Sequence, residues 1–236
     1  MKYDQDSIVA VISRADWFDD IPDDAIRLLA SKSLVKTYAP DQFIYLVGER
    51  PKHIYCVLSG RVRVSVTSSM GQEFVLTDMH AESWLGEASL IGGKTRVLEA
   101  AVIEETDILL IPADVVMRVA DQYPILYKNL FVEHMERTRQ VYELLAGMLF
   151  YPLKSRLAGR LLDLAKKHGE PSSDGVELDM HMSQLDFARM SLGSRQRVNK
   201  IFRDWVKQDI LLKQGDKYVI KDVEALRNAT RPEEQE

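Results

Sequence analysis

A series of short strand-like segments between Ser33 and Pro112 constrains the fold of this chain more than any other feature. The segments are "LVKTYA", "QFIYLVG", "HIYCVLSG", "RVRVSVTS", "EFVLTDM" and "TDILLIP". They are rich in Val, Ile, Tyr and Phe, several alternate strictly, and each is bounded by Gly, Pro, Ser or Asp, as strands separated by turns usually are. Short strands at this spacing predict a small β-sandwich or β-barrel.

Helical patterns lie on both sides of this strand region. The segment "DDAIRLLASK" before it begins with acidic residues, as a helix N-terminus prefers. After it, Pro112 or Ala113 can begin one helix, and a longer helix is predicted from Ile125 to about Leu149. Pro152 interrupts this pattern near a predicted hinge between domains, and "LKSRLAGRLLDLAKKHG" predicts a further amphipathic helix. The following "EPSSDGVELDM" is predicted as a loop that leads into a short strand.

The long helix carries an apolar seam whose members recur at alternating steps of four and three, as in a two-stranded coiled coil. The seam consists of Phe131, Met135, Thr138, Tyr142, Leu145 and Leu149, and a second stripe consists of Leu130, His134, Val141, Leu144 and Met148. A helix with two such stripes can pack on its own barrel and on a second copy of the chain. The seam is therefore the candidate dimer interface, and packing on its own domain alone is the alternative.

Length and cysteine content set further limits. With 236 residues, of which 46% are hydrophobic and 28% are charged, the chain can form one large or two modest domains. The single cysteine, Cys56, excludes an intramolecular disulfide and the cysteine-rich zinc and iron–sulfur sites. The acidic N-terminal sequence lacks a signal-peptide pattern, and no apolar run approaches the roughly 18 residues of a membrane span. We expect a cytoplasmic protein with no membrane partner.

Motifs for catalysis and metal binding are missing from the sequence. The five histidines share no metal-ligand spacing, and the chain contains neither a nucleophile–base–acid set nor a Walker-type phosphate loop. We therefore expect no metal site, no catalytic residues and no enzyme activity.

The charge of the chain is divided unevenly along its length. The net charge is −5, but residues 1–150 hold 15 Lys and Arg against 22 Asp and Glu, whereas residues 151–236 hold 16 against 14. Seven basic residues and two acidic ones lie between Arg189 and Lys213. A local positive face can therefore bind phosphates although the whole chain is acidic.

The segment from Ser183 to Leu211 predicts two short helices joined by a tight turn. Ser183 is a candidate N-cap for "QLDFARMS", in which Leu185, Ala188 and Met190 can face inward. Gly193 is predicted to form the turn, and Ser194 to cap the following helix, "RQRVNKIFRDWVKQ". This is the helix-turn-helix pattern. The next residues, "ILLKQGDKYVIKD", predict a β-hairpin wing.

The second helix has one apolar and one polar face. Its inward stripe is Val198, Ile201, Phe202 and Trp205. The candidate DNA-binding residues on and beside the other face are Ser194, Arg195, Gln196, Arg197, Asn199, Lys200 and Arg203. Arg can bind guanine edges, Gln and Asn suit adenine, and Lys and Arg bind phosphates. Their place in the first turns matches helices that enter the major groove; an ordinary solvated face is the alternative.

The whole chain, from about Asp16 to Val223, resembles the Crp/Fnr family of bacterial transcription regulators. The resemblance rests on "YLVGERPKHIYCVLSGRVRV", "LGEASLIGGKTR" and "LGSRQRVNKIFRDWVKQDIL" in this order. It implies an α+β fold with a jelly-roll-like N-terminal β-roll of the cyclic-nucleotide-binding type (1–123), a dimerisation helix and hinge (124–151) and a C-terminal winged helix-turn-helix domain (152–236). It also implies a homodimer on a palindromic operator, with RNA polymerase as a partner.

The resemblance assigns roles within the second helix. Ser194 and Arg195 match the pair that begins the family's recognition helix, and Arg195 resembles its guanine reader. The next position is often Glu in the family and is Gln196 here. We therefore expect a half-site that differs at that base, with adenine as the candidate.

The resemblance also implies an effector cassette in the β-roll. Gly86, Glu87 and Arg96 match the residues that hold the ribose and phosphate of a cyclic nucleotide. Val97 offers no hydroxyl, however, and the helix positions that contact the purine fall on Val141 and Tyr142. These departures disfavour cyclic AMP and leave open another small effector, no effector, or a purely structural Glu87–Arg96 ion pair.

Further alternatives concern sensing and transmission. Haem binding by Cys56 with a histidine is conceivable, but Cys56 lies in the apolar run "IYCVL" and is predicted to be a core residue. Residues 140–152 are predicted to transmit the effect of effector binding in the β-roll to the DNA-binding end of the chain. A ligand-sensing regulatory module without DNA binding is the alternative function, and it leaves the basic face of residues 195–207 unexplained.

Overall fold

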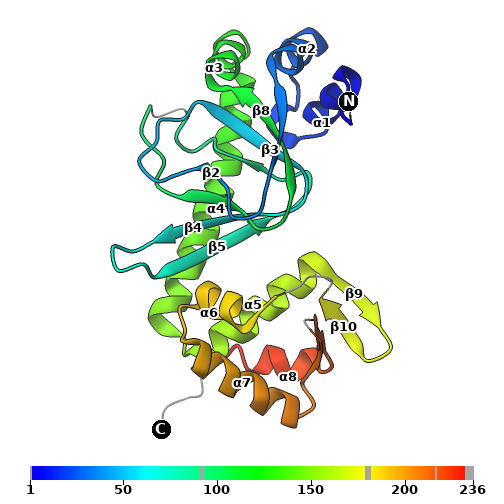
Figure 1. The fold of residues 1–236 in the computed structure, drawn as a ribbon, viewed down its shortest axis with the longest axis vertical. Helices are drawn as coiled ribbons and strands as arrows, with labels where there is room; N and C mark the ends of the chain where they lie inside the picture. Colours follow the sequence, from blue (N-terminus) through cyan, green and yellow to red (C-terminus); the bar gives the residue numbers. More distant parts are fainter. Residues whose placement is uncertain (1, 91–92, 179–181, 216, 232–236) are drawn as a thin grey trace. The chain divides into compact units, whose positions relative to one another are not determined.

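The computed structural model describes residues 2–90, 93–178, 182–215 and 217–231. The chain divides into two compact units, residues 1–71 with 76–140 and residues 72–75 with 141–236. Each unit combines helices with antiparallel strands, so the predicted α+β class is confirmed (Figure 1). The division falls within one long helix, and the predicted domain limits at residues 123 and 151 stay predictions.

Two four-stranded sheets form the roll of the first unit (Figure 1). One has the order β1 (Leu34–Tyr38), β8 (Thr106–Pro112), β3 (His53–Ser59) and β6 (Trp84–Leu85). The other has the order β2 (Phe43–Tyr45), β7 (Glu99–Val102), β4 (Val62–Thr67) and β5 (Glu73–Met79). Side chains from both sheets, among them Tyr38, Tyr45, Tyr55, Val62 and Ile108, pack in one inner cluster. The predicted barrel-like arrangement is thus observed, with the short strands β6 and β7 added.

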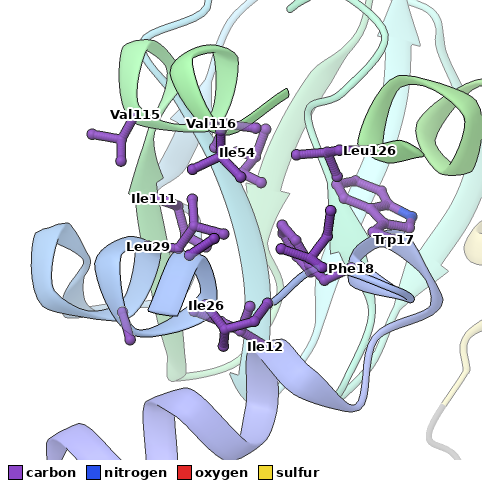
Figure 2. Packing of buried hydrophobic residues seen from close by; sticks show 14 of the residues in the cluster. Ile12, Trp17, Phe18, Ile26, Leu29, Ile54, Ile111, Val115, Val116 and Leu126 are labelled. Atoms are coloured by element: carbon purple, nitrogen blue, oxygen red, sulfur yellow. The ribbon is translucent and has the colours of Figure 1, made fainter. Parts of the chain in front are cut away.

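A second core lies outside the roll, where helices cover strands β3 and β8 (Figure 2). The helices are α1 (Gln5–Ser13), the 3-10 helix η1 (Asp16–Phe18), α2 (Asp23–Lys32) and α3 (Ala113–Gln122). Ile54 and Ile111 point from the strands toward Phe18 and Leu29. Cys56 belongs to this core, and burial raises the pKa of its thiol to about 12. The prediction that Cys56 is a core residue is confirmed.

Asp107 on β8 fastens the beginning of the chain to the roll. Its carboxylate accepts hydrogen bonds from Lys2 (2.7 Å), Tyr3 (3.3 Å), Thr37 (2.6 Å) and Ser59 (3.2 Å). A buried carboxylate that gathers several donors is strongly held in its charged form. Accordingly, the hydrogen bonds from Lys2 and Thr37 lower the pKa of Asp107 to about 2.

Helix α4 (Ile125–Phe150) begins where predicted and ends one residue later. Leu126 and Leu130 are buried against the outer core of the first unit. Five of the six seam residues, Phe131, Met135, Tyr142, Leu145 and Leu149, are instead exposed, and Thr138 is half-buried. An apolar row of this length facing solvent marks a candidate interface.

The second unit is a set of helices on a four-stranded sheet (Figure 1). The helices are α5 (Leu153–His168), α6 (Gln184–Ser191), α7 (Arg195–Lys207) and α8 (Val223–Asn228), and the strand order is β11 (Leu211–Gln214), β12 (Lys217–Ile220), β10 (Gly175–Leu178) and β9 (Gly169–Ser172). Rings of Phe187, Phe202 and Tyr218 meet edge to face at 5.0–5.3 Å, a favoured aromatic geometry.

Two local predictions for this unit are wrong. Residues 170–172, predicted as loop, belong to strand β9 (Gly169–Ser172), which pairs with β10 and completes a hairpin despite Pro171. Leu185, predicted to face inward, is exposed, and Phe187 takes the buried place on α6. The predicted wing hairpin of β11 and β12 is confirmed. Its turn residue Asp216 lies outside the described residues.

Candidate nucleic-acid interface and effector cassette

The turn between α6 and α7 uses two residues for two different purposes. Leu192 adopts the left-handed conformation (φ 49°, ψ 48°) that ends α6. Gly193 has no positive φ, but a Cβ there would lie 2.7 Å from Cδ1 of Leu153. The predicted tight turn at Gly193 is therefore observed, but the residue in it that adopts the left-handed conformation is Leu192. Glycine is required at position 193 because helix α5 approaches the backbone closely.

Both predicted N-caps are confirmed. The Ser183 hydroxyl accepts a hydrogen bond from the Asp186 amide, and the Asp186 carboxylate accepts one from the Ser183 amide in return. The Ser194 hydroxyl accepts a bond from the Arg197 amide at 3.3 Å. Each cap typically stabilises a helix by about 1 kcal/mol, so the start of α7 is fixed by its own sequence.

Helix α7 presents the predicted polar face to solvent. Val198, Phe202 and Trp205 are buried, while Arg195, Gln196, Arg197, Lys200 and Arg203 are exposed and Asn199 is half-buried. Within the described part of the chain, no carboxylate pairs with the basic members of this face. The first turn of α7 also contains no acidic residue. Unpaired cations at a helix start are available to an anionic partner.

Arg156 on α5 adds a cation that the sequence did not reveal. Its guanidinium donates to the Met148 carbonyl at 3.2 Å. Burial lowers the pKa of Arg156, and the positive charge of Arg197 lowers it further. The guanidinium groups of two different helices therefore influence each other electrostatically. Only the tertiary fold brings them together, because 41 positions separate them in the chain.

The cassette of the first unit begins at Gly86. This residue has a φ of 103°, and a Cβ would lie 3.1 Å from the Tyr55 ring and 3.2 Å from the Arg96 guanidinium. Glycine is thus required for conformation and for space. Glu87 and Arg96 are only 3% and 4% exposed, so the structure brings all three predicted residues into one buried region.

Glu87 is bound by Arg137 of helix α4. Nη1 of Arg137 lies 3.0 Å from each carboxylate oxygen of Glu87. Arg137 also donates to the Trp84 carbonyl at 2.7 Å and to Glu133 at 2.9 Å, and it lies over the Trp17 ring. The alternative of a Glu87–Arg96 ion pair is therefore wrong. Sequence reasoning missed Arg137 because its partner is 50 residues away and its neighbours belong to the exposed seam.

Arg96 is a buried cation without a carboxylate partner among the described residues. Its guanidinium lies 4.5 Å from the centre of the Tyr45 ring and donates to the carbonyls of Gly86 and, at 2.7 Å, His53. Its Nε has no hydrogen-bond partner. A buried, uncompensated guanidinium is energetically unfavourable unless an anion completes it. This supports the prediction that Arg96 binds an anionic group.

The other predicted effector residues are less enclosed. Val97 is 69% exposed, and Val141 and Tyr142 are exposed and belong to the second unit.

The described residues contain no cluster of three His, Cys, Asp or Glu side chains that could hold a metal ion, and His181 lies outside them. Over the same ranges, no helix has the length and apolar character needed to cross a bilayer.

Two family models match the chain, one in each half. The cyclic nucleotide-binding domain matches residues 35–123, and the Crp-like helix-turn-helix domain matches residues 155–229. The chain belongs to the Crp/Fnr family. It is therefore a Crp/Fnr-type transcriptional regulator, with a helix-turn-helix DNA-binding domain and an effector-binding type of β-roll, which confirms the resemblance predicted from the sequence.

Relatives match almost the whole chain. The "CRP-like cAMP-activated global transcriptional regulator" of Mycobacterium tuberculosis is 24% identical over 221 residues, which cover 94% of this chain and 99% of that protein. FixK2 of Bradyrhizobium japonicum has a TM-score of 0.75 at 18% identity, over 85% of this chain and 98% of FixK2. A CooA mutant from Carboxydothermus hydrogenoformans has a TM-score of 0.74 at 21% identity, over 85% of this chain and 89% of the CooA chain. These structures share the Crp/Fnr fold with this chain.

Proposed function

We propose that this Crp/Fnr regulator binds a two-fold operator as a homodimer and reads it with the N-terminal turns of α7. The observation that carries the proposal is the unpaired polar face of α7, with Arg195, Gln196 and Lys200 exposed on it. Arg195 is assigned to a guanine, Gln196 to an adenine, and Arg197, Asn199, Lys200 and Arg203, with the Ser194 cap, to further bases and phosphates. RNA polymerase is the partner expected of the family, and the proposed role is regulatory and cytoplasmic.

The test is DNA binding by the full chain, measured by fluorescence anisotropy on an operator selected from a random library. Logarithmic affinity should fall linearly with logarithmic salt concentration. Arg195→Ala should weaken binding by about 1–3 kcal/mol, and Arg27→Ala on the exposed side of α2 should leave it unchanged. A protein that shows no salt-dependent binding to any duplex would instead favour the ligand-sensing module.

We assign the dimer interface to the seam of α4, composed of Phe131, Met135, Thr138, Tyr142, Leu145 and Leu149. Its support is the exposure of all but Thr138 along one helix face. Apolar side chains at alternating steps of four and three suit knobs-into-holes packing against the same helix of a second copy. A two-fold dimer also matches a palindromic operator.

We further propose that a small anionic effector completes Arg96, with Gly86 and Glu87 shaping its site. The buried, uncompensated guanidinium supports an anion. Cyclic AMP is disfavoured because Val97 supplies no hydroxyl. Calorimetric titration of the dimer with cyclic AMP, followed by DNA affinity with and without it, tests this assignment. DNA affinity that rises only with cyclic AMP would overturn it and would align the chain with its mycobacterial relative.

A further inference from the structure

A cavity of about 340 Å³ lies in the roll beside the cassette, with which it shares wall residues that contact Arg96. Its walls come from strands β1, β2, β3 and β8 and from residues 49–52, and neither Glu87 nor Arg96 lines it. This volume is at the small end of ligand pockets, which measure about 300–1,000 Å³.

The rim of the cavity is positively charged. Lys36, Arg50 and Lys52 line it, and none of them forms an ion pair with any residue in the described ranges. Glu49 is the carboxylate in the wall. Three unpaired cations against one anion leave a positive potential that favours an anionic ligand.

The floor of the cavity is neutral and aromatic. Tyr38, Tyr45 and Tyr55 line it together with aliphatic side chains, and the Tyr45 and Tyr55 ring centres lie 5.6 Å apart. Burial raises the pKa of Tyr45 to about 12, so its hydroxyl carries no charge near neutral pH. Rings of this kind pack against flat or apolar groups.

The wall of this cavity also holds Arg96 in place. The His53 carbonyl accepts from Arg96 at 2.7 Å, and the Arg96 guanidinium lies over the Tyr45 and Tyr55 rings. Burial lowers the pKa of His53, and the charges of Lys52 and Arg96 lower it further. The buried cation therefore adds to the positive potential of the cavity from behind its wall.

We propose that this cavity is a second ligand site, which binds a small anion with a planar apolar body, such as an aryl phosphate or an aryl carboxylate. The anionic group meets Lys36, Arg50 and Lys52, and the planar body packs on the tyrosines. A ligand seated there touches the residues that hold Arg96, so the two sites are coupled through His53 and Tyr45. The proposal does not depend on which effector the cassette binds.

Isothermal titration of the full chain with phenyl phosphate and with benzoate tests the proposal. At least one probe should bind, and neutral benzyl alcohol should not. In the double variant Arg50→Gln/Lys52→Gln the affinity should fall about tenfold, corresponding to roughly 1.4 kcal/mol for two charge contacts. The matched control Arg27→Gln/Lys32→Gln removes the same charge from exposed positions of α2 and should bind within about twofold of wild type.

Three results would overturn the proposal. One is the absence of binding of both probes at millimolar concentration. Another is equal affinity of the Arg50→Gln/Lys52→Gln and control proteins. The third is a combination of two observations: cyclic AMP displaces the probe one for one, and the Arg50→Gln/Lys52→Gln protein binds the probe with the affinity of wild type. Together they would place the probe in the cassette. DNA binding by the same protein samples is measured separately, so loss of the proposed regulatory function cannot be mistaken for loss of this site.

Discussion

The carboxylate of Asp107 connects several segments of the first unit by hydrogen bonds. It is nearly buried, it accepts hydrogen bonds from two strands, and it ties Lys2 and Tyr3 to β8. Because Lys2 is itself mostly exposed, solvent weakens its attraction to the carboxylate. The neutral donors Thr37 and Ser59 therefore share the task of stabilising the charge.

Replacing Asp107 by Asn should destabilise the first unit by about 1–2 kcal/mol at pH 7, because charge-assisted hydrogen bonds are lost. The pKa of Asp107 is lowered to about 2 from a usual 3.8. Its stabilising contribution is therefore complete above about pH 4 and disappears as pH falls toward 2. Urea unfolding of wild type and Asp107→Asn between pH 7 and pH 3 measures this; a difference that is independent of pH would contradict the role of the charge.

The turn before α7 offers a pair of opposite substitutions. Leu192→Asn should raise stability by roughly 0.5–1 kcal/mol, because Asn tolerates the left-handed conformation better than Leu and this Leu side chain is largely exposed. Gly193→Ala should lower stability by about 1–3 kcal/mol, because its Cβ would collide with buried Leu153. Differential scanning calorimetry should give transitions shifted in opposite directions. Equal shifts would contradict the assignment of the left-handed conformation to Leu192 and of the close approach of helix α5 to Gly193.

Helices α4 and α7 each combine a buried stripe with an exposed one. In α7 the buried stripe of Val198, Phe202 and Trp205 fixes which residues face outward. In α4 the buried residues Leu126 and Leu130 lie near its beginning, and the apolar surface beyond them is exposed. In each helix, packing of the buried residues therefore determines which side chains face solvent, and these exposed side chains are available to a partner.

Gln196→Glu should change the preferred base rather than abolish binding. A carboxylate accepts from cytosine N4, whereas an amide both donates and accepts and so suits adenine. Operator selection from a random library, carried out with both proteins, should yield half-sites that differ at one position. Arg203→Ala is the comparison, since loss of a phosphate contact should weaken binding to all sequences alike. Identical consensus sites for wild type and Gln196→Glu would refute the assignment.

Leu145→Asp should dissociate the dimer, because it places a charge in the apolar seam of both copies. Losses of about 3 kcal/mol correspond to a dissociation constant raised roughly 100-fold. Gln140→Asp introduces the same side chain on the opposite, exposed side of α4 and should leave the dimer intact. Sedimentation equilibrium measures both; if the two variants behave alike, the seam is not the interface.

Net charge differs between the β-roll and the DNA-binding part of the chain. Residues 1–150 have 22 acidic against 15 basic residues, whereas the unpaired cations of α7 lie in the second unit. Like charges repel, so the acidic β-roll should add nothing to DNA affinity. The affinity for the phosphates of DNA should then depend on the second unit alone.

Salt titration tests this division. Lys200→Gln should reduce the slope of logarithmic affinity against logarithmic salt by about one, because one phosphate contact is lost. Lys32→Gln in the first unit changes the total charge equally and should leave the slope unaltered. Equal slopes for the two variants would mean that net charge, rather than the face of α7, controls binding.

Local patterns in the sequence predicted much of this architecture. The segments "EFVLTDM" and "TDILLIP" coincide with β5 and β8, and Ser183 and Ser194 cap their helices as expected. Their signals are side-chain alternation and nearby hydrogen bonds, which short windows contain. Strand β6 has two residues, and β9 is Gly169–Ser172 with a proline, so neither carries such a pattern.

In the candidate sites, too, local patterns predicted some features and tertiary contacts determined the others. Exposure on α7 follows from its 3.6-residue period, and burial of Glu87 and Arg96 together follows from a family motif. The Arg137–Glu87 pair and the proximity of Arg156 to Arg197 depend on tertiary approach between distant segments. No local spacing encodes such contacts, and the left-handed conformation of Leu192 at the end of α6 runs against the preference of leucine.

Burial of Cys56 makes this chain a convenient host for spectroscopic probes. Its thiol is fully enclosed and its pKa is raised to about 12, so it presents almost no thiolate to a maleimide or nitroxide reagent. A cysteine introduced at an exposed position such as Gln140 can then be labelled selectively without removing the native thiol. Electron-spin distances between two labelled copies would follow the regulator through its working cycle in an otherwise unaltered core.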